Sequence, residues 1–331
     1  MPERSELSPE VIEWVFLLLP GVILLDVAGP ADALRIAASH GAPYRLRFVG
    51  PSAVAHSSIG LGLSGCEPLP DRLPDCARIV VPGVSARYNG FVENEAAQAR
   101  VWLQSHGAGG RQLVTVCAGA LLAAEAGLLA GRRCTTHHSL IEELVRREPL
   151  AKIEEDRIFV EDGPIATSAG ITSGIDLALH LIAATASPQI AATTARELVV
   201  YLRRGGGDPQ LSPWLEHRNH LHRAVHKVQD IVAREPQKMW SVTELADLAH
   251  VSARHLSRLF SAHAGIGLVE YRQKLQLAYA ADLLQHGRHS IERVAELAGF
   301  ASGRDFRRVW GKHRQDTPSL FRVGKGLAGA E

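Results

Sequence analysis

The sequence lacks several features that would place it in a specialised class of protein. Its 331 residues include only four cysteines, without a Cys-x-x-Cys pair, which argues against a disulfide scaffold or a zinc ribbon and fits a reduced cytoplasm. No uninterrupted apolar run approaches the ~18 residues of a membrane span. The longest N-terminal candidate, residues 15–25, is broken by Pro20 and Gly21, and glutamates precede it where a signal peptide would be basic. We therefore expect a cytoplasmic protein with no membrane partner, no metal and no cofactor.

The net charge of +1 conceals a division of charge along the chain. Residues 1–218 hold 19 Lys and Arg against 24 Asp and Glu, a net of −5. Residues 219–331 hold 17 against 11, a net of +6, so the two parts sum to the +1 of the whole chain. Such asymmetry suggests that the second part meets a polyanion, although +6 is only moderately basic for its length.

Strands alternate with helices in the first part. Short apolar runs predict strands, and apolar residues at helical spacing predict helices of ten to fifteen residues. This alternation indicates an α/β domain with a mostly parallel sheet flanked by helices. The predicted strands are residues 14–19, 45–49, 78–82, 112–116 and 165–168, and the predicted helices are 24–38, 94–106, 119–129 and 175–185.

A cluster of glycines and a proline separates the two parts. The helical stretch 190–202 is followed by Arg-Arg-Gly-Gly-Gly-Asp-Pro at 203–209, and glycine and proline interrupt regular structure. We place a linker at residues 204–216. The predicted domains are then residues 10–203 and 217–323.

Cys117 occupies a position of chemical interest. It lies between the predicted strand 112–116 and the helix that follows, and open α/β sheets bind ligands at the carboxyl ends of their strands. We expect the helix N-terminus to lower the pKa of the thiol and to hold an anion. Gly119 allows the tight turn. The alternative is a small apolar cysteine packed under the helix.

Three segments resemble the PfpI and class I glutamine amidotransferase-like superfamily. Residues 116–137, which begin Val-Cys-Ala-Gly-Ala and end Thr-Thr-His, resemble its cysteine elbow. Leu-Asp-Val-Ala-Gly-Pro at 25–30 and Ser-Ala-Gly-Ile-Thr-Ser-Gly at 168–174 resemble two further segments, in the same order. The resemblance covers about residues 12–200 and implies a flavodoxin-like fold. It also implies a ligand pocket formed by Asp26, Gly83, Cys117, Ala118 and His137.

The superfamily contains hydrolases, isonitrile hydratases and sensors without catalytic activity. Ala118 stands where PfpI-type peptidases have a histidine and isonitrile hydratases have a hydroxyl residue, and Val84 replaces the second glycine of a common pair. We therefore favour ligand sensing and expect no enzyme. Two alternatives stay open. One is a thiol-dependent hydrolase or hydratase with Cys117 as nucleophile and His137 as base. The other is a cysteine redox sensor, in which Cys134 is a conceivable partner without a spacing argument.

The second part contains one pattern twice, about 49 residues apart. Each copy has a serine suited to cap a helix, Ser241 or Ser290, then apolar residues at i, i+3, i+4 and i+7. A short turn and a second serine, Ser252 or Ser302, then open a second helix. Only the first copy has the acid of a capping box, Glu244. Short helix, tight turn and second helix is the helix-turn-helix plan, in which the second helix enters the major groove.

The second helix of each copy carries arginines away from its apolar stripe. The stripes are Leu256, Leu259 and Phe260 in one copy and Phe306, Val309 and Trp310 in the other. Arginine reads guanine or binds phosphate, and a basic face that occurs twice is hard to explain as solvation alone. The residues predicted to contact DNA are Arg254, Ser257, Arg258, Arg304, Arg307 and Arg308.

Residues 219–322 resemble the AraC/XylS family of DNA-binding domains. The matching segments are Ser-Ala-Arg-His-Leu-Ser-Arg-Leu-Phe, Ala-Gly-Phe-Ala-Ser and Thr-Pro-Ser-Leu-Phe-Arg. In that family one long helix joins the two units, and the resemblance implies such a helix at about 268–285 here. Gly303 and Asp305 depart from the usual pattern. A PfpI-like domain followed by such a domain resembles the GlxA group of bacterial transcriptional regulators. This implies a sequence-specific regulator, often an activator, that binds promoter DNA and a small-molecule effector. It also implies a homodimer, and it leaves RNA polymerase open as a partner.

Overall fold

The computed structural model describes residues 11–85, 93–107, 110–170, 172–200, 204–206, 210, 216–218, 220–287, 289–314 and 316–326. It divides the chain into two compact units, Met1–Gln210 and Leu211–Glu331. The predicted linker, residues 204–216, lies largely outside the described residues, since only 204–206, 210 and 216 are described.

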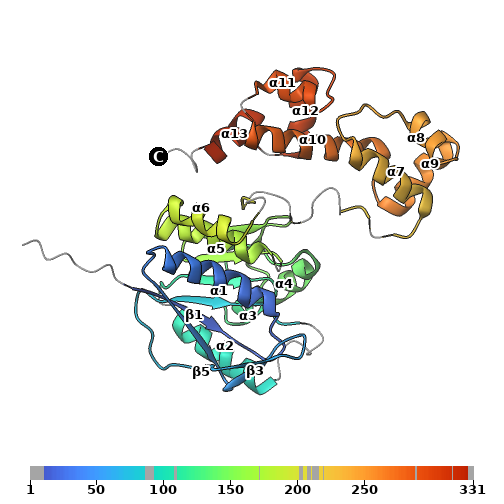
Figure 1. Ribbon diagram of the computed structural model, residues 1–331. Coiled ribbons are helices and arrows are strands. Elements are labelled where there is room, and N and C mark those ends of the chain that lie inside the picture. The colour runs from blue at the N-terminus through green and yellow to red at the C-terminus, as the bar shows by residue number, and fades with distance from the viewer. Residues whose placement is uncertain are drawn as a thin grey trace, which may run out of the picture. The chain divides into compact units, whose positions relative to one another are not determined.

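The described part of the first unit contains a seven-stranded sheet with the spatial order β10-β11-β7-β6-β1-β2-β5 (Figure 1). All neighbouring strands are parallel except β10 and β11, which are antiparallel. The predicted strands are confirmed, while the antiparallel edge strand β10 and two small two-stranded sheets, the antiparallel pair β3–β4 and the parallel pair β8–β9, were not predicted. The strands are β1 (Ile12–Leu17), β2 (Tyr44–Gly50), β3 (Val54–His56), β4 (Gly62–Ser64), β5 (Glu67–Pro68), β6 (Arg78–Val81), β7 (Leu113–Val116), β8 (Arg133–Cys134), β9 (Lys152–Ile153), β10 (Phe159–Asp162) and β11 (Ile165–Ser168).

Helices cover both faces of this sheet (Figure 1). Because side chains alternate along a strand, Val15 and Leu17 of β1 enter one core, and Trp14 and Phe16 enter the other. The first core holds residues of α2, α3 and α4, and the second those of α1, α5 and α6. The helices are α1 (Leu24–Ser39), α2 (Glu93–Gly107), α3 (Gly119–Glu125), α4 (Ile141–Arg147), α5 (Ser173–Thr185) and α6 (Pro188–Glu197), with a short 3-10 turn, η2, at His138–Leu140.

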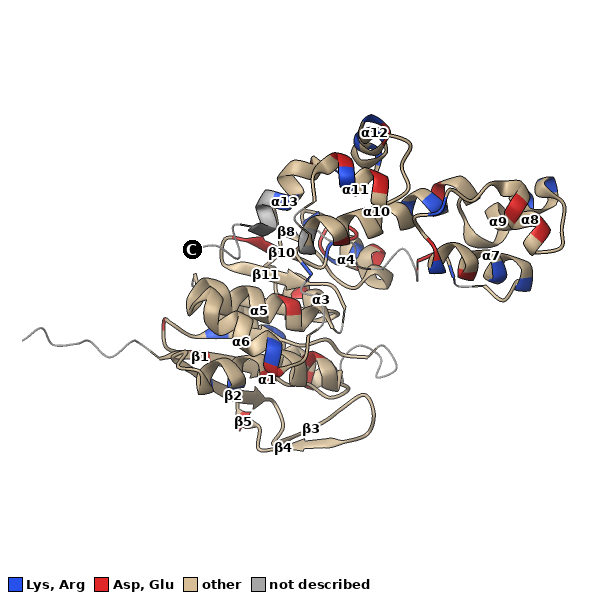
Figure 2. Cartoon of the chain, turned by 45° about the horizontal axis from the view of Figure 1, so that its top comes forward, with Lys and Arg blue, Asp and Glu red and all other residues tan. Residues whose placement is uncertain are grey.

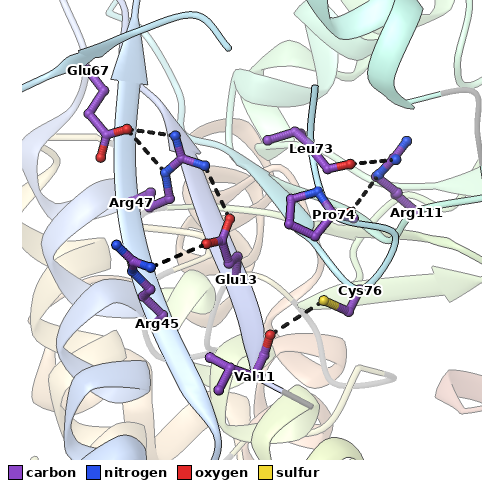
Figure 3. Close-up of polar contacts among 9 residues, drawn as sticks. All are labelled: Val11, Glu13, Arg45, Arg47, Glu67, Leu73, Pro74, Cys76 and Arg111. Carbon is purple, nitrogen blue, oxygen red and sulfur yellow. Dashed lines mark hydrogen bonds and ion pairs between the residues drawn. The ribbon is translucent and has the colours of Figure 1, made fainter. Parts of the chain in front are cut away.

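Ion pairs join the neighbouring strands at one edge of the sheet (Figure 3). Arg47 of β2 lies between Glu13 of β1, at 3.2 Å, and Glu67 of β5, at 2.6 Å, and Arg45 lies 3.8 Å from Glu13. Arg111 donates to the carbonyl oxygens of Leu73 and Pro74 and so holds the loop before β6. Glu13 and Arg45 lie near the beginnings of their strands, so this cluster serves strand pairing and is separate from the carboxyl ends.

The second unit consists of two helical bodies that share one long helix, α10 (Leu268–His286) (Figure 1). Leu268, Tyr271 and Leu275 in its first half belong to the core of α7, α8 and α9. Leu277 and Leu284 in its second half belong to the core of the last three helices. The other helices are α7 (Arg223–Arg234), α8 (Val242–Leu248), α9 (Ala253–Ala264), α11 (Ile291–Leu297), α12 (Gly303–His313) and α13 (Pro318–Gly326). At 19 residues, α10 is ~28 Å long.

All four predicted serine caps are confirmed. Ser241, Ser252, Ser290 and Ser302 each accept a hydrogen bond from the backbone N–H three residues on, at 3.1–3.3 Å. Glu244 also accepts from the N–H of Ser241, which completes the predicted capping box. Each cap satisfies a backbone donor that would otherwise lack a partner and thereby marks where its helix begins.

The turns of the two helix-turn-helix bodies differ. His250 adopts a left-handed φ of 57° in the first, and Gly299 a φ of 79° in the second. A Cβ atom on Gly299 would lie 1.8 Å from the carbonyl oxygen of Gln237, so the second turn requires glycine. Gln276, buried in the middle of α10, donates to the Gly299 carbonyl oxygen at 3.2 Å. These contacts fix the two bodies against each other.

Among the described residues, no helix is both long enough and apolar enough to cross a membrane.

Candidate functional sites in the two domains

The first candidate site lies at the carboxyl ends of β1, β6 and β7, and we call it the elbow site. Asp26, in the first turn of α1, is fully buried, and its Oδ2 accepts a hydrogen bond of 3.0 Å from the N–H of Gly83. A Cβ atom on Gly83 would lie 2.5 Å from Asp26 Oδ2, 3.0 Å from the Ala118 nitrogen and 3.0 Å from Cys117 Cβ. These four predicted residues therefore meet at one point, and glycine is required there.

Burial determines the protonation of Asp26. Desolvation raises the pKa of its carboxyl from 3.8 to about 7, although the hydrogen bond from Gly83 works in the opposite direction. Its second oxygen, Oδ1, is buried and has no hydrogen-bond partner among the described residues. An unsatisfied buried polar atom is uncommon and costly in a folded protein, so Oδ1 calls for an explanation.

Cys117 forms the elbow between β7 and α3 with a φ of 55°, a conformation that is uncommon for a residue other than glycine. Its N–H donates to the carbonyl oxygen of Ser168 at 3.0 Å, and its carbonyl oxygen accepts from the Thr136 hydroxyl at 2.8 Å. A Cβ atom on Gly119 would lie only 2.0 Å from the carbonyl oxygen of Val81, so the strand and helix approach each other closely. The predicted tight turn is confirmed.

The predicted lowering of the Cys117 pKa is wrong. Burial, and then the nearby Asp26 carboxyl, raise the pKa of the thiol to about 12, and a hydrogen bond from Ala118 offsets only part of this. The short helix that begins at Gly119 does not compensate for the loss of solvent around the sulfur. The thiol is therefore neutral at physiological pH.

His137 lies beside the elbow but is not bonded to Cys117 in any described contact. Its Nδ1 is 2.7 Å from the Ser139 hydroxyl, and its ring lies against that of His138 with the two planes tilted by 34°. A Cβ atom on Gly170 would lie 2.8 Å from Cδ2 of His137. Burial and then His138 lower the pKa of His137, so its ring is neutral at physiological pH. The hydrogen bond that joins this segment to Cys117 comes from the preceding residue, Thr136, whose role the sequence analysis did not predict.

The second candidate site is the exposed face of α9, the second helix of the first helix-turn-helix body. Leu256 and Phe260 are buried, and Leu259 is partly buried against the same core, as the predicted stripe requires. Arg254, Ser257 and Arg258 are exposed. Arg258 Nη2 lies 3.2 Å from the His255 ring, and the Ser257 hydroxyl donates to the Ala253 carbonyl oxygen within the helix. This face therefore presents two arginines to solvent.

Lys and Arg also recur along α12 (Figure 2). The arginines on its matching face are exposed, but two of them pair with acids. Arg307 pairs with Glu292 of α11 at 2.6 Å, and Arg308 pairs with Asp305 at 2.7 Å. The pairing with Arg307 lowers the pKa of the Glu292 carboxyl. Arg304 is exposed on the same helix. The importance of Glu292 was missed, because it lies on the preceding helix and only the fold brings it to Arg307.

Together, a flavodoxin-like α/β unit with a cysteine elbow and two helix-turn-helix bodies define a two-domain protein of the kind that couples a sensor to DNA. Comparison with family models agrees: the DJ-1/PfpI family matches residues 14–184, and a helix-turn-helix domain matches residues 245–323. The chain belongs to the DJ-1/PfpI family. The predicted fold class and the predicted fusion to an AraC-type domain are confirmed, and the chain is a DNA-binding transcription regulator.

Individual proteins resemble the chain over different lengths. The HTH-type transcriptional regulator GbdR of Pseudomonas aeruginosa is 30% identical over 94% of this chain and 84% of its own. The isonitrile hydratase of Pseudomonas putida is 37% identical, but over only 50% of this chain and 68% of its own. A solved ThiJ/PfpI family protein from Pseudomonas syringae has a TM-score of 0.51 at 20% identity, covering 80% of this chain and 98% of its own, which shows a likeness of fold. The full-length resemblance is thus to a regulator.

Proposed function

We propose that this regulator recognises specific promoter sequences through α9 and α12 and responds to a small molecule held at the elbow site. The observation that carries the DNA-binding role is the pair of capped second helices, each with a buried stripe and exposed arginines. Residues Arg254, Ser257, Arg258, Arg304, Arg307 and Arg308 are the proposed DNA contacts. The proposed domains are residues 10–203 and 217–323.

The elbow site supports a binding role through what it leaves unsatisfied. Asp26 Oδ1 is buried without a partner among the described residues, and both Cys117 and His137 are neutral at physiological pH. Because the pKa of the Asp26 carboxyl is about 7, Oδ1 accepts a hydrogen bond from a ligand N–H or O–H when the carboxyl is ionised and donates one to a ligand oxygen or nitrogen when it is protonated. We therefore propose that the effector is a small molecule with a polar group that hydrogen-bonds Asp26 Oδ1, bound by Asp26, Gly83, Cys117, Ala118 and His137.

We further propose that the elbow site does not catalyse a reaction. The neutral thiol is a poor nucleophile, and in the described contacts His137 Nδ1 faces Ser139 rather than Cys117. The likeness to an isonitrile hydratase makes the test specific. Purified full-length protein should not turn over isonitriles or amides, and turnover that disappears in Cys117→Ser would establish the enzyme instead.

A redox role receives less support than ligand binding. Burial raises the pKa of both Cys117 and Cys134 to about 12, and the thiolate is the form that oxidants attack. Peroxide treatment followed by mass spectrometry should leave both sulfurs reduced. Selective oxidation of Cys117 at low peroxide concentration would favour the redox sensor.

The remaining proposals concern the setting of the regulator. We propose a homodimer in the cytoplasm that activates transcription, with RNA polymerase as the further partner of an activator. The family model, the full-length relative and the helix-turn-helix geometry support DNA binding. The dimer, the cytoplasmic location, activation and the contact with RNA polymerase are proposals that go beyond this support.

Arginine substitutions test the DNA-binding role. Arg258→Ala and Arg308→Ala should each weaken operator binding by ~1–3 kcal/mol if the side chain contacts a base, with less loss on unrelated DNA. Arg35→Ala, which removes an exposed arginine from α1, is the matched control. Equal losses on all sequences would restrict the two residues to phosphate contacts. Failure of the wild-type protein to bind any promoter DNA at low salt would refute the proposed function.

Thermal-shift screening tests the effector. Amines, amino acids and their derivatives should be screened against the full chain. A true ligand at a hundred times its Kd stabilises the protein by ~2.7 kcal/mol. Asp26→Asn should abolish or sharply reduce the shift, because the replaced oxygen is the proposed attachment point. An unchanged shift in Asp26→Asn would place the ligand elsewhere.

A further inference from the structure

The beginning of the linker is bound tightly to the α/β domain. Arg204 donates to the carboxylate of Asp176 from its backbone N–H at 3.0 Å, from Nε at 2.9 Å and from Nη2 at 2.7 Å. Nη2 also donates to the Thr172 hydroxyl at 2.9 Å. Asp176 is buried in the first turn of α5, and a buried carboxylate needs such charged donors. One linker residue is therefore anchored to the start of α5.

Two further linker residues continue this attachment. Gly206 lies against β10, where a Cβ atom on it would be 2.7 Å from the carbonyl oxygen of Phe159 and about 3 Å from its ring. The N–H of Gln210 donates to Asp156 at 2.8 Å, and its Nε2 donates to the Thr136 carbonyl oxygen at 2.9 Å. We call residues 204–206 and 210 the strap. Gln210 is the last residue of the first compact unit.

The strap is connected to the elbow by two routes. The first is a chain of hydrogen bonds, since Gln210 donates to the Thr136 carbonyl oxygen and the Thr136 hydroxyl donates to the Cys117 carbonyl oxygen. The second is packing: a Cβ atom on Gly174, in the first turn of α5, would lie 3.0 Å from Val116, the residue before Cys117. A shift of the elbow by a ligand would therefore reach both anchors of the strap.

We propose that the strap couples occupancy of the elbow site to the linker that leads to the DNA-binding domain. Arg204 and Gln210 are positioning residues in this scheme, and they contact no ligand themselves. The ligand and the strap are coupled if each prefers one arrangement of the Thr136 segment. Ligand binding then changes the stability of strap attachment, and strap attachment changes the ligand affinity by the same factor. This inference rests on the proposed function, because it presumes that the elbow site binds the effector.

Hydrogen–deuterium exchange of the full-length protein tests the coupling without DNA or effector. Gln210→Ala removes the contact to Thr136. We expect exchange to rise about fivefold, the equivalent of one net hydrogen bond, in peptides that span 115–120 and 134–139 as well as in the strap. Gln98→Ala, an exposed glutamine on α2, is the matched control. Faster exchange confined to the strap would mean that it is a passive tether and would overturn the proposal.

The reverse direction provides a second measurement. Thr136→Val removes the hydroxyl that donates to Cys117, and Thr136→Ser retains it. Strap exchange should rise about fivefold in Thr136→Val and return to the wild-type rate in Thr136→Ser. Equal strap exchange in the two variants would overturn the proposal. If Thr136→Val does not fold, the Gln210→Ala measurement decides alone.

The outcome for the coupling is separable from that for the function. Arg258→Ala reports on DNA recognition, whereas the exchange measurements report only on the α/β domain. If Arg258→Ala loses operator discrimination while elbow exchange is unchanged in Gln210→Ala, the proposed DNA-binding function stands and the proposed coupling through the strap is wrong.

Discussion

At the elbow site, Asp26 and Cys117 are almost completely buried, whereas Arg254 and Arg258 on α9 and Arg304 on α12 lie in solvent. Desolvation raises the pKa of both buried groups, so that near neutral pH the Cys117 thiol is neutral and the Asp26 carboxyl is about half protonated. At the buried site, the protonation and position of the side chains depend on the surrounding backbone. At the exposed site, the charge belongs to the arginine side chains themselves. Substitutions should therefore affect folding at the first site and binding at the second.

Glycine substitutions should show the largest difference between the two regions. Gly119→Ala places a Cβ atom 2.0 Å from the Val81 carbonyl oxygen, so we expect a loss of ~4 kcal/mol or more in the free energy of unfolding. Gly311→Ala, in α12, meets no atom within 4 Å and should stabilise its helix by up to ~1 kcal/mol. Urea unfolding of both variants measures the comparison. Equal changes in the free energy of unfolding of the two variants would show that the backbone around Gly119 can shift to accommodate a Cβ atom.

The titration of Asp26 should be visible in the difference between the pH dependence of stability of the wild type and that of Asp26→Asn. Its pKa is 3.8 in the unfolded chain and about 7 in the folded protein. Between these values the folded state holds a proton that the unfolded state has released, so stability falls as the pH rises from about 4 to about 7 and is level above it. Relative to Asp26→Asn, which has no carboxyl to titrate, the wild type should lose ~2–4 kcal/mol over this range.

Chemical denaturation at several pH values measures this difference. Other titrating groups cancel because both proteins contain them. Asp32→Asn, which removes an exposed carboxyl from the same helix, is the control and should follow the wild type. Parallel curves for wild type and Asp26→Asn would show that Asp26 is ionised in the folded protein.

The same contrast explains how far the sequence could be interpreted. Local signals were sufficient for the caps of α8, α9, α11 and α12, because a serine and a backbone N–H three residues on are neighbours along the chain. The order of strands and helices followed from periodicity. The meeting of Asp26, Gly83 and Cys117 came from the resemblance to a family, since no spacing along the chain relates them.

Properties that depend on burial or on distant neighbours were not accessible in this way. The pKa of Cys117 was predicted in the wrong direction, because the position at a helix start is visible in the sequence and the loss of solvent is not. The strand β10 lies at the edge of the sheet because it pairs with β11, and this antiparallel pairing was not predicted from the sequence. The anchoring of Arg204 by Asp176 joins residues that the sequence places on a helix and in a linker.

The smallest predicted effect distinguishes the two recognition helices. Glu292 holds Arg307 of α12 in an exposed ion pair, and no acid plays this role for Arg254 or Arg258 among the described contacts of α9. Glu292→Gln should release Arg307 toward DNA and tighten operator binding about two- to fivefold, more at low salt than at high salt. Titration of a promoter fragment at two salt concentrations measures this change.

Glu296→Gln provides the matched control for that measurement. It makes the same change of charge on the same helix, α11, but its partner is Arg293, which lies outside the recognition helix. A general gain in positive charge would tighten binding equally in both variants. A gain specific to Glu292→Gln would show that the second helix-turn-helix body is held below its full affinity by its own acid. The first body, whose arginines are not restrained in this way, would then supply the larger share of the DNA affinity.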